Sequence, residues 1–380
     1  MKRGIVLLWI IFSFIVSNSQ ITFERKFRPV DGYSVWSTLQ TGDSGYVFTG
    51  RVKDSLFIGG LNKYGKLKWF KTFVGDGSIA CTGRYMIRTT DNCFVVSGDY
   101  GLNSYWQFFI IKFDSTGSIK FKKHYSRGDD VKGVSLVEGA DGYIIIGNSQ
   151  DASYNYHINI LKINKTTGDS ITCKSYMDPD YMKFFEIKKL KDNNYLMVGT
   201  RYDSVCLMKI NNNGDSLWSK RYHAYYTGYT FAQAADNGYV VGTDGLVFKT
   251  KADGTEDWVK YQEDWGFGTS YWVNFNEIIP TLDGNYVVVG SWDPKYPWAF
   301  IQKFSPTGDS IWQRLFYDKI SWTEALFVQQ TSDNGFVISA DQFDTSEYNF
   351  SFMYLDVIKT DKNGEVYQVD TPSICLVTLD

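Results

Sequence analysis

The residues of this chain that could do chemistry are three histidines, scattered carboxylates and many aromatic rings. The histidines are His124, His157 and His223, and no two of them have the short spacing of a metal site. The carboxylates that we expect in irregular loops on one face of the molecule are Asp178, Asp180, Glu263, Asp264, Asp293, Asp318 and Glu324. Two carboxylates either about 5 Å or about 6.5 to 9.5 Å apart can hydrolyse a glycosidic bond. Because the sequence does not pair any of these residues, it assigns no catalytic residue, no metal site and no cofactor.

Aromatic residues provide the candidate binding site. Aspartates recur at intervals of 44 to 51 residues, at Asp43, Asp91, Asp141, Asp192, Asp236, Asp283 and Asp333. Eleven residues before the last four of these aspartates stand Tyr181, Tyr225, Trp272 and Trp322. Rigid aromatic rings give ligands a large contact area, so we predict that these four rings contact a ligand. We add four loop residues to this predicted site: Trp106, Trp265, Trp292 and Trp298. The alternative role for the four repeated rings is to plug a central channel.

The recurring aspartates belong to a repeat that predicts the fold. Asp333–Ala340 reads Asp-Asn-Gly-Phe-Val-Ile-Ser-Ala, and a second phrase such as Lys303–Trp312 recurs between successive aspartates. Alternating apolar residues on both sides of short glycine-containing turns are typical of β-hairpins. Repetition at this period is typical of propellers. We therefore predict an all-β protein, a seven-bladed β-propeller of four-stranded antiparallel blades. We label the strands of each blade A to D in chain order.

The N-terminal segment Ile21–Phe27 resembles the D strand Ile311–Tyr317, although no A, B or C strand precedes it. A propeller joins its first and last blades and so removes exposed sheet edges. We predict that this segment closes the ring beside Phe352–Lys359. The segment Glu365–Val369 competes for the same place, and the sequence leaves open which of the two is farther out.

One tryptophan position recurs in the D strands, at Trp69, Trp218, Trp258 and Trp312. A stacking platform for sugars or bases is one interpretation of this repetition. Recurrence at the same place in successive blades favours a packing role instead. We predict that Trp218 and Trp312 are buried between blades.

Residues 1–19 have a basic start, an apolar run and a Ser-Asn-Ser site, which together predict a cleaved signal peptide; a retained anchor is the alternative. We assign residues 20–370 to a single propeller domain and residues 371–380 to a C-terminal tail. No later segment has the roughly 20 apolar residues of a membrane span, so we expect no stable membrane insertion. The predicted location is the cell exterior or cell surface, with the periplasm as an alternative.

Charge and cysteine content limit the partners and the redox chemistry. Removing Lys2 and Arg3 with the signal leaves 37 basic residues against 42 acidic ones, and this acidic balance argues against a nucleic-acid partner. The five cysteines have no metal-type spacing, and four of them lie in or beside predicted strands. We expect buried thiols there, although one disulfide stays open, and we expect a monomer.

The combination of Asp-x-Gly-Tyr-Val-Val-x-Gly with Ile-Lys-x-Asp-x-x-Gly-x-x-x-Trp resembles the repeats of secreted bacterial β-propeller proteins. Many of those proteins carry a C-terminal type IX secretion sorting domain, which this sequence lacks after residue 370. The resemblance covers residues 21–369 and implies a propeller that is exported. The C-to-D turns are also distantly similar to quinoprotein propeller repeats and to the Asp-boxes of sialidases. Neither similarity brings catalytic residues with it.

Three functional hypotheses follow. The first is a secreted, non-catalytic propeller scaffold whose aromatic loop face binds an extracellular glycan or protein. The second is a glycan-active hydrolase or lyase that uses two of the loop carboxylates. The third is a purely structural surface protein. Carboxylates that converge on the channel mouth would favour the enzyme, and aromatic rings without such a pair would favour binding.

Overall fold

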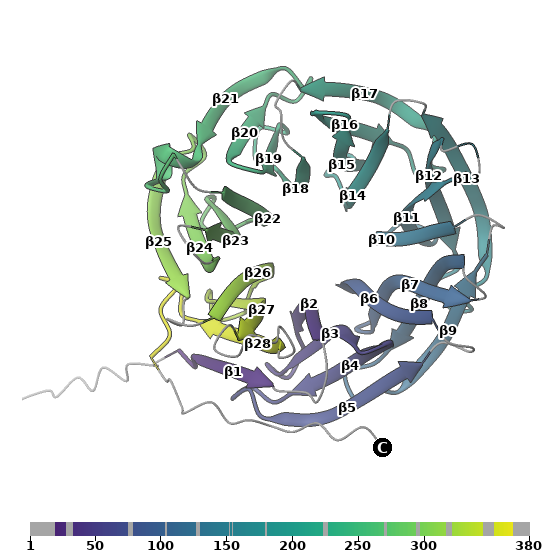
Figure 1. Ribbon diagram of the computed structural model, residues 1–380, viewed down its shortest axis with the longest axis horizontal. Coiled ribbons are helices and arrows are strands. Elements are labelled where there is room, and N and C mark those ends of the chain that lie inside the picture. The colour runs from purple at the N-terminus through teal and green to yellow at the C-terminus, as the bar shows by residue number, and fades with distance from the viewer. Residues whose placement is uncertain are drawn as a thin grey trace, which may run out of the picture.

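The computed structural model describes residues 20–27, 33–74, 79–102, 105–126, 130–151, 153, 155–178, 181–222, 227–269, 272–293, 297–316, 321–344 and 353–367. Seven antiparallel sheets of four strands each surround a central channel, with the A strands innermost (Figure 1). The predicted seven-bladed β-propeller is confirmed. The signal peptide and the C-terminal tail lie outside the described residues, so their boundaries stay predictions.

The first four blades follow one another along the chain, each in the order A to D from the channel outward. Their strands are β2 Tyr33–Gln40, β3 Tyr46–Val52, β4 Ser55–Leu61 and β5 Leu67–Val74 in blade 1; β6 Ile79–Arg88, β7 Phe94–Leu102, β8 Tyr105–Phe113 and β9 Ile119–Tyr125 in blade 2; β10 Asp130–Glu138, β11 Tyr143–Gln150, β12 Tyr156–Ile163 and β13 Ser170–Asp178 in blade 3; β14 Met182–Lys189, β15 Tyr195–Arg201, β16 Ser204–Ile210 and β17 Ser216–Tyr222 in blade 4.

The last three blades contain the closure of the ring and a single 3-10 turn, η1 Gln262–Trp265, between blades 5 and 6. Their strands are β18 Gly228–Gln233, β19 Tyr239–Thr243, β20 Leu246–Thr250 and β21 Glu256–Tyr261 in blade 5; β22 Trp272–Pro280, β23 Tyr286–Asp293, β24 Trp298–Phe304 and β25 Ser310–Phe316 in blade 6; β26 Ser321–Gln330, β27 Phe336–Asp344, β28 Met353–Thr360 and β1 Phe23–Phe27 in blade 7.

The N-terminal strand closes the ring as predicted. Strand β1 pairs antiparallel with β28, with Phe23 opposite Lys359 and Phe27 opposite Leu355. The competing segment forms no strand within residues 361–367, although the Tyr367 amide donates to Thr22 Oγ1 at 2.9 Å. The last blade is therefore completed by the first strand of the chain, which joins the two ends of the ring.

The B and C strands form the core because neighbouring blades cover both of their faces. Strand β15 shows the consequence, since its first six residues are all buried. The D strands instead alternate between half-buried and exposed residues, as in β17. Three of the described cysteines, Cys81, Cys93 and Cys206, are buried as expected, whereas Cys173 is exposed.

The repeated tryptophans pack between blades as predicted, but Trp218 and Trp312 are only half-buried, so their predicted burial was too high. The Trp218 ring lies 6.2 Å from that of Tyr239 in blade 5, and the Trp312 ring lies 6.1 Å from that of Phe336 in blade 7. Their outer sides face solvent because no further strand covers the D strand. The position is nevertheless a contact between adjacent blades.

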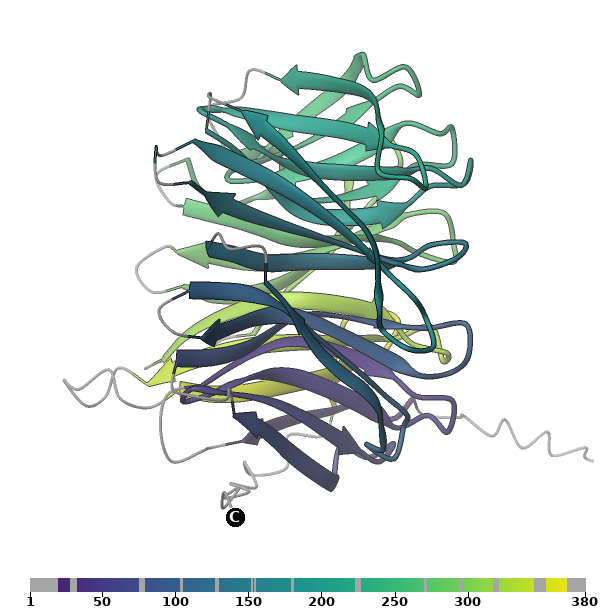
Figure 2. The same ribbon diagram turned by 90° about the vertical axis from the view of Figure 1, so that its right-hand side faces the viewer.

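The two faces of the ring are built differently. The short A-to-B and C-to-D turns lie together on one face, which we call the turn face (Figure 2, right-hand side). The B-to-C loops and D-to-A crossovers lie on the other, which we call the loop face.

No helix among the described residues is long and apolar enough to cross a membrane.

Candidate functional site

A β-bulge recurs in every A strand and directs one residue of each blade toward the channel. The register of each A-to-B pair shifts at the same place, seven residues before the repeated aspartate. Bulges re-aim side chains and are frequent beside functional sites. The bulged residues, which we call the channel ring, are Trp36, Arg84, Val134, Phe185, Tyr229, Asn276 and Leu326. Seven blades thus present seven different side chains.

The glycine of the repeat allows this bulge. In blade 2 a Cβ on Gly98 would lie 1.7 Å from the carbonyl oxygen of Thr82, and in blade 6 a Cβ on Gly290 would lie 1.7 Å from that of Asn274. No side chain fits such an approach without backbone movement. The glycine that ends the Tyr-Val-Val-x-Gly motif therefore permits the close approach of the A strand in these two blades, whereas blade 7 has Ala340 at the same position.

A cavity of about 390 Å³, the channel cavity, is lined by A-strand residues of all seven blades. The whole channel ring contributes to its wall. The remaining lining residues are Tyr85, Glu186, Asn274, Glu277, Glu324 and Phe327. This volume lies within the range of small-molecule binding sites, and the wall mixes aromatic rings with a few amide and charged groups, as such sites do.

A buried ionic cluster forms part of the cavity wall. Lys188 Nζ lies 2.8 Å from Glu186 Oε1 and 2.8 Å from Glu277 Oε1, and it donates to the Phe231 carbonyl at 2.7 Å. Glu186 Oε2 also accepts the Phe231 amide at 3.0 Å. Burial and the nearby negative charge of Glu186 raise the pKa of Glu277 to about 8. Lys188 therefore forms ion pairs with two carboxylates, and Glu186 and Glu277 together hold one proton in addition to those of the lysine.

Glu324 is the carboxylate nearest the loop-face end of the channel cavity. It lies on β26 and accepts a hydrogen bond of 2.9 Å from Asn276 Nδ2. Burial raises the pKa of Glu324 above its ordinary range. Asn276 also donates to the Ala325 carbonyl at 2.9 Å, so its amide is held in one orientation. The hydrogen-bonded side chains of Asn276 in blade 6 and Glu324 in blade 7 thus form one part of the cavity wall.

A second cavity of about 320 Å³, the side pocket, adjoins the first through the shared residues Arg84, Val134 and Phe185. It is completed by Asn148, Ser149, Gln150, Tyr156 and Lys183 from blades 3 and 4. Its lining contains two cationic side chains and no carboxylate, whereas the lining of the channel cavity contains three carboxylates. The two connected cavities therefore differ in charge.

Three of the four rings predicted for the channel mouth are described, and they lie just before or at the start of the A strands. Trp272 is 74% exposed, Tyr181 is 39% exposed and Trp322 is 38% exposed. Residues two apart in a β-strand point to the same side of the sheet. Trp272 stands two residues before Asn274, and Trp322 stands two residues before Glu324, and both Asn274 and Glu324 line the channel cavity. Tyr225 lies outside the described residues. Rings of blades 4, 6 and 7 thus stand on the loop-face side of the cavity.

Tyr181 belongs to a small cationic and aromatic cluster. Its ring centre lies 4.2 Å from that of Tyr156, and Lys183 Nζ donates to its hydroxyl at 3.0 Å. This hydrogen bond lowers the pKa of Tyr181. Tyr181 has a φ of 57°, which is a strained backbone angle for a large side chain.

The four loop tryptophans are in different environments. Trp106, Trp292 and Trp298 are half-buried, and the rings of Trp292 and Trp298 meet edge to face at 5.7 Å. Trp265 is 5% exposed, and its indole N–H donates to the Gly308 carbonyl at 2.8 Å. The expectation that Trp265 lies on an accessible loop surface was wrong.

Trp265 replaces a tyrosine of the repeat. Hydroxyls of D-strand tyrosines donate to the carbonyl of the turn glycine in the next blade, as Tyr176 does to Gly214 and Tyr222 does to Gly254, both at 2.6 Å. The indole of Trp265 makes the same contact from the η1 crossover. Its position is therefore one of packing between blades 5 and 6.

The loop carboxylates do not form a common site among the described residues. Glu324 alone lines the channel cavity, while Asp264 accepts the Tyr261 amide within η1. Asp180 and Asp318 lie outside the described residues, and so does His223. His124 stacks on Tyr100 at 4.9 Å, and His157 Nε2 lies 3.0 Å from Asp151 Oδ2. Among the described residues no cluster of histidine, cysteine or carboxylate side chains has the geometry of a metal site.

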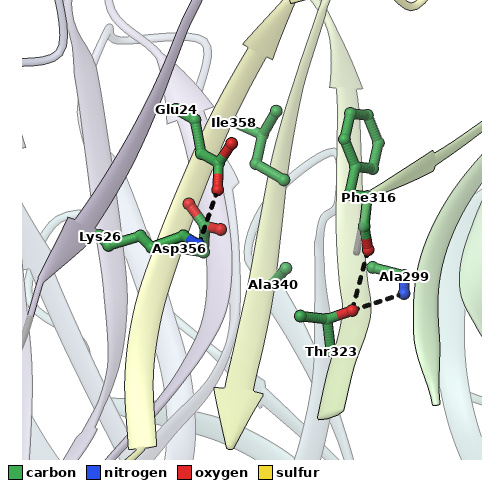
Figure 3. A pocket seen from close by; sticks show the side chains of 8 residues that line it. All are labelled: Glu24, Lys26, Ala299, Phe316, Thr323, Ala340, Asp356 and Ile358. Atoms are coloured by element: carbon green, nitrogen blue, oxygen red, sulfur yellow. Dashed lines mark hydrogen bonds and ion pairs between the residues drawn. The ribbon is translucent and has the colours of Figure 1, made fainter. Parts of the chain in front are cut away.

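A small cavity of about 40 Å³ lies at the closing seam and is lined by Glu24, Lys26 and Asp356 together with residues of blades 6 and 7 (Figure 3). Lys26 Nζ lies 3.1 Å from Glu24 Oε1. Burial and the nearby Glu24 raise the pKa of Asp356 well above its ordinary range. This space has room for about one water molecule, so it is part of the seam and not a ligand site.

The sequence prediction missed the channel ring. The signal was present, since counting back seven residues from each repeated aspartate gives all seven members. The seven residue types differ, so no repetition of residue type marked the position. The buried cluster of Glu186, Lys188 and Glu277 was missed for a related reason, because its members come from two non-adjacent blades.

Known structures share the fold. No protein-family model and no curated protein sequence matches the chain. A protein of unknown function from Bacteroides caccae has a TM-score of 0.50 at 12% identity, covering 72% of this chain and 93% of its own. A virginiamycin B lyase from Staphylococcus aureus, solved with quinupristin, has a TM-score of 0.52 at 9% identity and covers 88% and 99%. A chain of the mitotic checkpoint complex has a TM-score of 0.58 at 10% identity and covers 95% and 99%.

These identities establish the fold alone. The protein is a seven-bladed β-propeller, and its structural neighbours include proteins of unknown function, a lyase and a chain of a protein assembly. Such diversity is general for propellers, which serve as binding and scaffold domains. The particular resemblance to secreted repeat proteins stays a prediction from the motifs.

Proposed function

We propose that this protein is a secreted, non-catalytic binding propeller that recognises a carbohydrate at the loop-face end of its channel. The channel cavity carries the proposal, because its wall places aromatic rings beside amide and carboxylate groups. A sugar presents apolar C–H faces that pack on rings and hydroxyls that bond to planar polar groups. The turn face instead consists of short hydrogen-bonded turns.

The position of the exposed rings agrees with entry from the loop face. Trp272 and Trp322 stand two residues before Asn274 and Glu324, which line the cavity. An extended ligand that stacks on these rings would reach the polar groups below them. Rings at the rim and hydrogen-bonding groups inside form a continuous amphipathic surface, which suits a chain of sugars.

An unpaired donor in the cavity wall gives further support. The indole Nε1 of Trp36 is buried and has no hydrogen-bond partner among the described residues. A buried polar group without a partner costs free energy, so a ligand or water molecule that accepts this hydrogen bond gains binding energy. Among the seven members of the channel ring, Trp36 is thus a direct candidate for a ligand contact.

A glycan-cleaving activity is the second candidate function. Glu324 and Glu277 both line the channel cavity, and burial raises the pKa of each, as a general acid requires. Both carboxylates already have protein partners, Asn276 and Lys188 respectively. Binding without cleavage therefore remains the preferred function.

The test is a glycan array probed with the mature protein, residues 20–380, followed by calorimetric titration of the best glycan. Binding of one carbohydrate class, weakened at least tenfold by Trp272→Ala, is the expected result. Tyr64→Ala is the matched control, because Tyr64 is 49% exposed in a C-to-D turn of the opposite face. Absence of any carbohydrate binding would refute the proposal. Release of shorter glycans, lost in Glu324→Gln, would establish the second candidate instead.

A further inference from the structure

We infer that the carbohydrate is acidic and that Arg84 binds its carboxylate or sulfate group where the channel cavity meets the side pocket. This inference rests on the proposed function and names the class of ligand. It depends on three observations: the fixed orientation of Arg84, the donors that Arg84 leaves unused, and the uneven distribution of charge around the two cavities.

Arg84 is held in one orientation by two neighbours. Its Nε donates to Asp99 Oδ2 at 2.5 Å, and Asp99 is completely buried on β7. Its guanidinium carbon lies 5.5 Å from the centre of the Trp36 ring, so the planar group packs against the indole. The β-bulge of β6 directs the same residue toward the channel. An arginine fixed in this way loses little entropy when it binds a ligand.

The two terminal nitrogens of Arg84 are available for that ligand. Among the described residues, the only hydrogen bond of this side chain is the one from Nε to Asp99. The side chain is 31% exposed and lines both cavities. The terminal nitrogens of a guanidinium match the two oxygens of a carboxylate or sulfate. The group therefore retains the geometry for bidentate recognition of an anion.

The surroundings of Arg84 attract an anion on one side only. Lys183 is the second cation of the side pocket, and its Nζ bonds to the Tyr181 hydroxyl and not to a carboxylate. Asp99 neutralises part of the charge on Arg84, but Lys183 keeps the side pocket cationic. An acidic group would therefore lie toward blades 2 to 4, where the side pocket begins.

The opposite wall suits the neutral part of the same ligand. Blade 2 lies across the channel from blades 5 and 6 (Figure 1). Tyr229 and Asn276 occupy the channel ring there, and Glu324 of blade 7 lies beside Asn276. An anion is disfavoured near Glu324, whereas sugar hydroxyls can donate to its carboxylate. A ligand with one acidic group among hydroxyls fits both walls in a single orientation.

The test compares a uronic-acid oligosaccharide with its carboxyl-reduced counterpart by calorimetric titration, with a sulfated oligosaccharide as a second arm. The wild type is expected to bind the uronate at least tenfold more tightly than the reduced sugar. Arg84→Gln should remove this preference and leave binding of the reduced sugar within about twofold. Arg84→Lys should restore only part of it, because an ammonium lacks the fork of two donors.

The matched control is Arg88→Gln, which removes the same charge from the same strand. Arg88 lies at the turn-face end of β6, where its terminal nitrogen bonds to Asn92. The control should keep the preference for the uronate. Equal binding of acidic and reduced sugars by the wild type, or an unchanged preference in Arg84→Gln, would overturn the inference while the proposed carbohydrate function stood. A sulfate preference lost in Arg84→Gln would assign the site to sulfated glycans.

Discussion

The turn face and the channel ring are built by the same repeat in opposite ways. On the turn face, six blades repeat one ion pair between the aspartate of the A-to-B turn and a lysine of the C strand. In blade 2 this pair joins Asp91 to Lys112 at 2.6 Å. Blade 1 has Gly60 at the lysine position, and Lys68 contacts Asp43 from the D strand at 3.5 Å. The channel ring instead has seven different residues at a backbone position that is equally regular.

The comparison separates scaffold from recognition. A residue type that recurs in every blade has a structural role that all blades share, such as forming a turn or contacting the neighbouring blade. Where the backbone geometry recurs but the side chain varies, the side chain is not needed for the scaffold and can take part in recognition. In this protein the bulge supplies the recurring geometry and the channel ring supplies the variation.

Gly290→Ala should damage the geometry that both regions share. The added Cβ would lie 1.7 Å from the Asn274 carbonyl oxygen, so the A strand of blade 6 must move. Overpacking of this severity should lower the free energy of unfolding by about 3 kcal/mol. Blade 7 has Ala340 at the equivalent position, which makes Ala340→Gly the matched control, with an expected loss within about 1 kcal/mol. Urea unfolding measures both, and equal stability of wild type and Gly290→Ala would show that the bulge adapts freely.

Trp312→Ala should weaken the scaffold and leave recognition intact. The ring packs against Phe336 of the next blade, and a Cβ on Gly364 would lie 2.8 Å from it. Because the ring is only half-buried, its removal should cost about 2 to 3 kcal/mol, toward the low end for tryptophan truncation. Thermal unfolding checks the loss. A folded variant that lost glycan binding would contradict the separation of roles.

Glu277→Gln should change how stability depends on pH. The pKa of Glu277 is raised to about 8 in the folded protein, so the folded state binds its proton more tightly than the unfolded state does. This contribution is complete below the ordinary pKa and is lost as pH rises from about 4.5 to 8. The variant should therefore gain about 3 kcal/mol relative to wild type between pH 5 and pH 8, at about 1.4 kcal/mol per pH unit. Asp341, whose pKa burial raises to about 7, supplies a background that both proteins share.

Parallel unfolding curves of wild type and Glu277→Gln over that pH range would show that the cluster carries no spare proton. A decline that is steeper in the variant would contradict the proposed excess of carboxylates over lysine.

Asp91→Asn should have the smallest effect, because one member of its ion pair is exposed. Lys112 is nearly buried, but the Asp91 side chain is 53% exposed, so solvent screens the pair and the loss should be within about 1 kcal/mol. Although partial burial opposes the shift, the hydrogen bond from Lys112 lowers the pKa of Asp91 to about 2. The contribution is present above about pH 4 and disappears as pH falls through 2. Wild type and variant should therefore converge in stability at pH 2. A difference in stability that widened toward pH 2 would contradict the predicted pH dependence of this ion pair.

The sequence predicted the scaffold well because the scaffold repeats. The spacing of the aspartates gave the number of blades, and the lone D-like segment Ile21–Phe27 gave the closure, which strand β1 confirms. The burial of Trp218 and Trp312 was overestimated because the sequence pattern of a strand does not show whether a further strand covers it, and the D strands have solvent on their outer side.

The site was harder to predict because it is assembled from single residues of separate blades. Trp265 was assigned to the binding face from its loop position, but its indole makes the contact that tyrosine makes elsewhere in the ring. Arg84 and Trp36 lie 48 residues apart in sequence and come together only through the bulges of adjacent blades. A register shift of this kind leaves no mark in residue type, so the constant spacing to the repeated aspartate is the trace that the channel ring leaves in the sequence.

The most direct test of the central claim compares Trp→Phe substitutions at two positions, each of which removes the indole N–H donor together with the five-membered ring and keeps a six-membered aromatic ring. Trp36 of the channel ring has an indole Nε1 without a partner among the described residues, whereas Trp69 Nε1 donates to the Ser115 carbonyl at 3.2 Å. Calorimetric titration of the best glycan from the array should show threefold to tenfold weaker binding for Trp36→Phe, about the contribution of one hydrogen bond, at unchanged melting temperature. Trp69→Phe should bind as wild type does and melt slightly earlier. Unchanged affinity in Trp36→Phe together with weakened binding in Trp69→Phe would contradict the assignment of recognition to the channel ring.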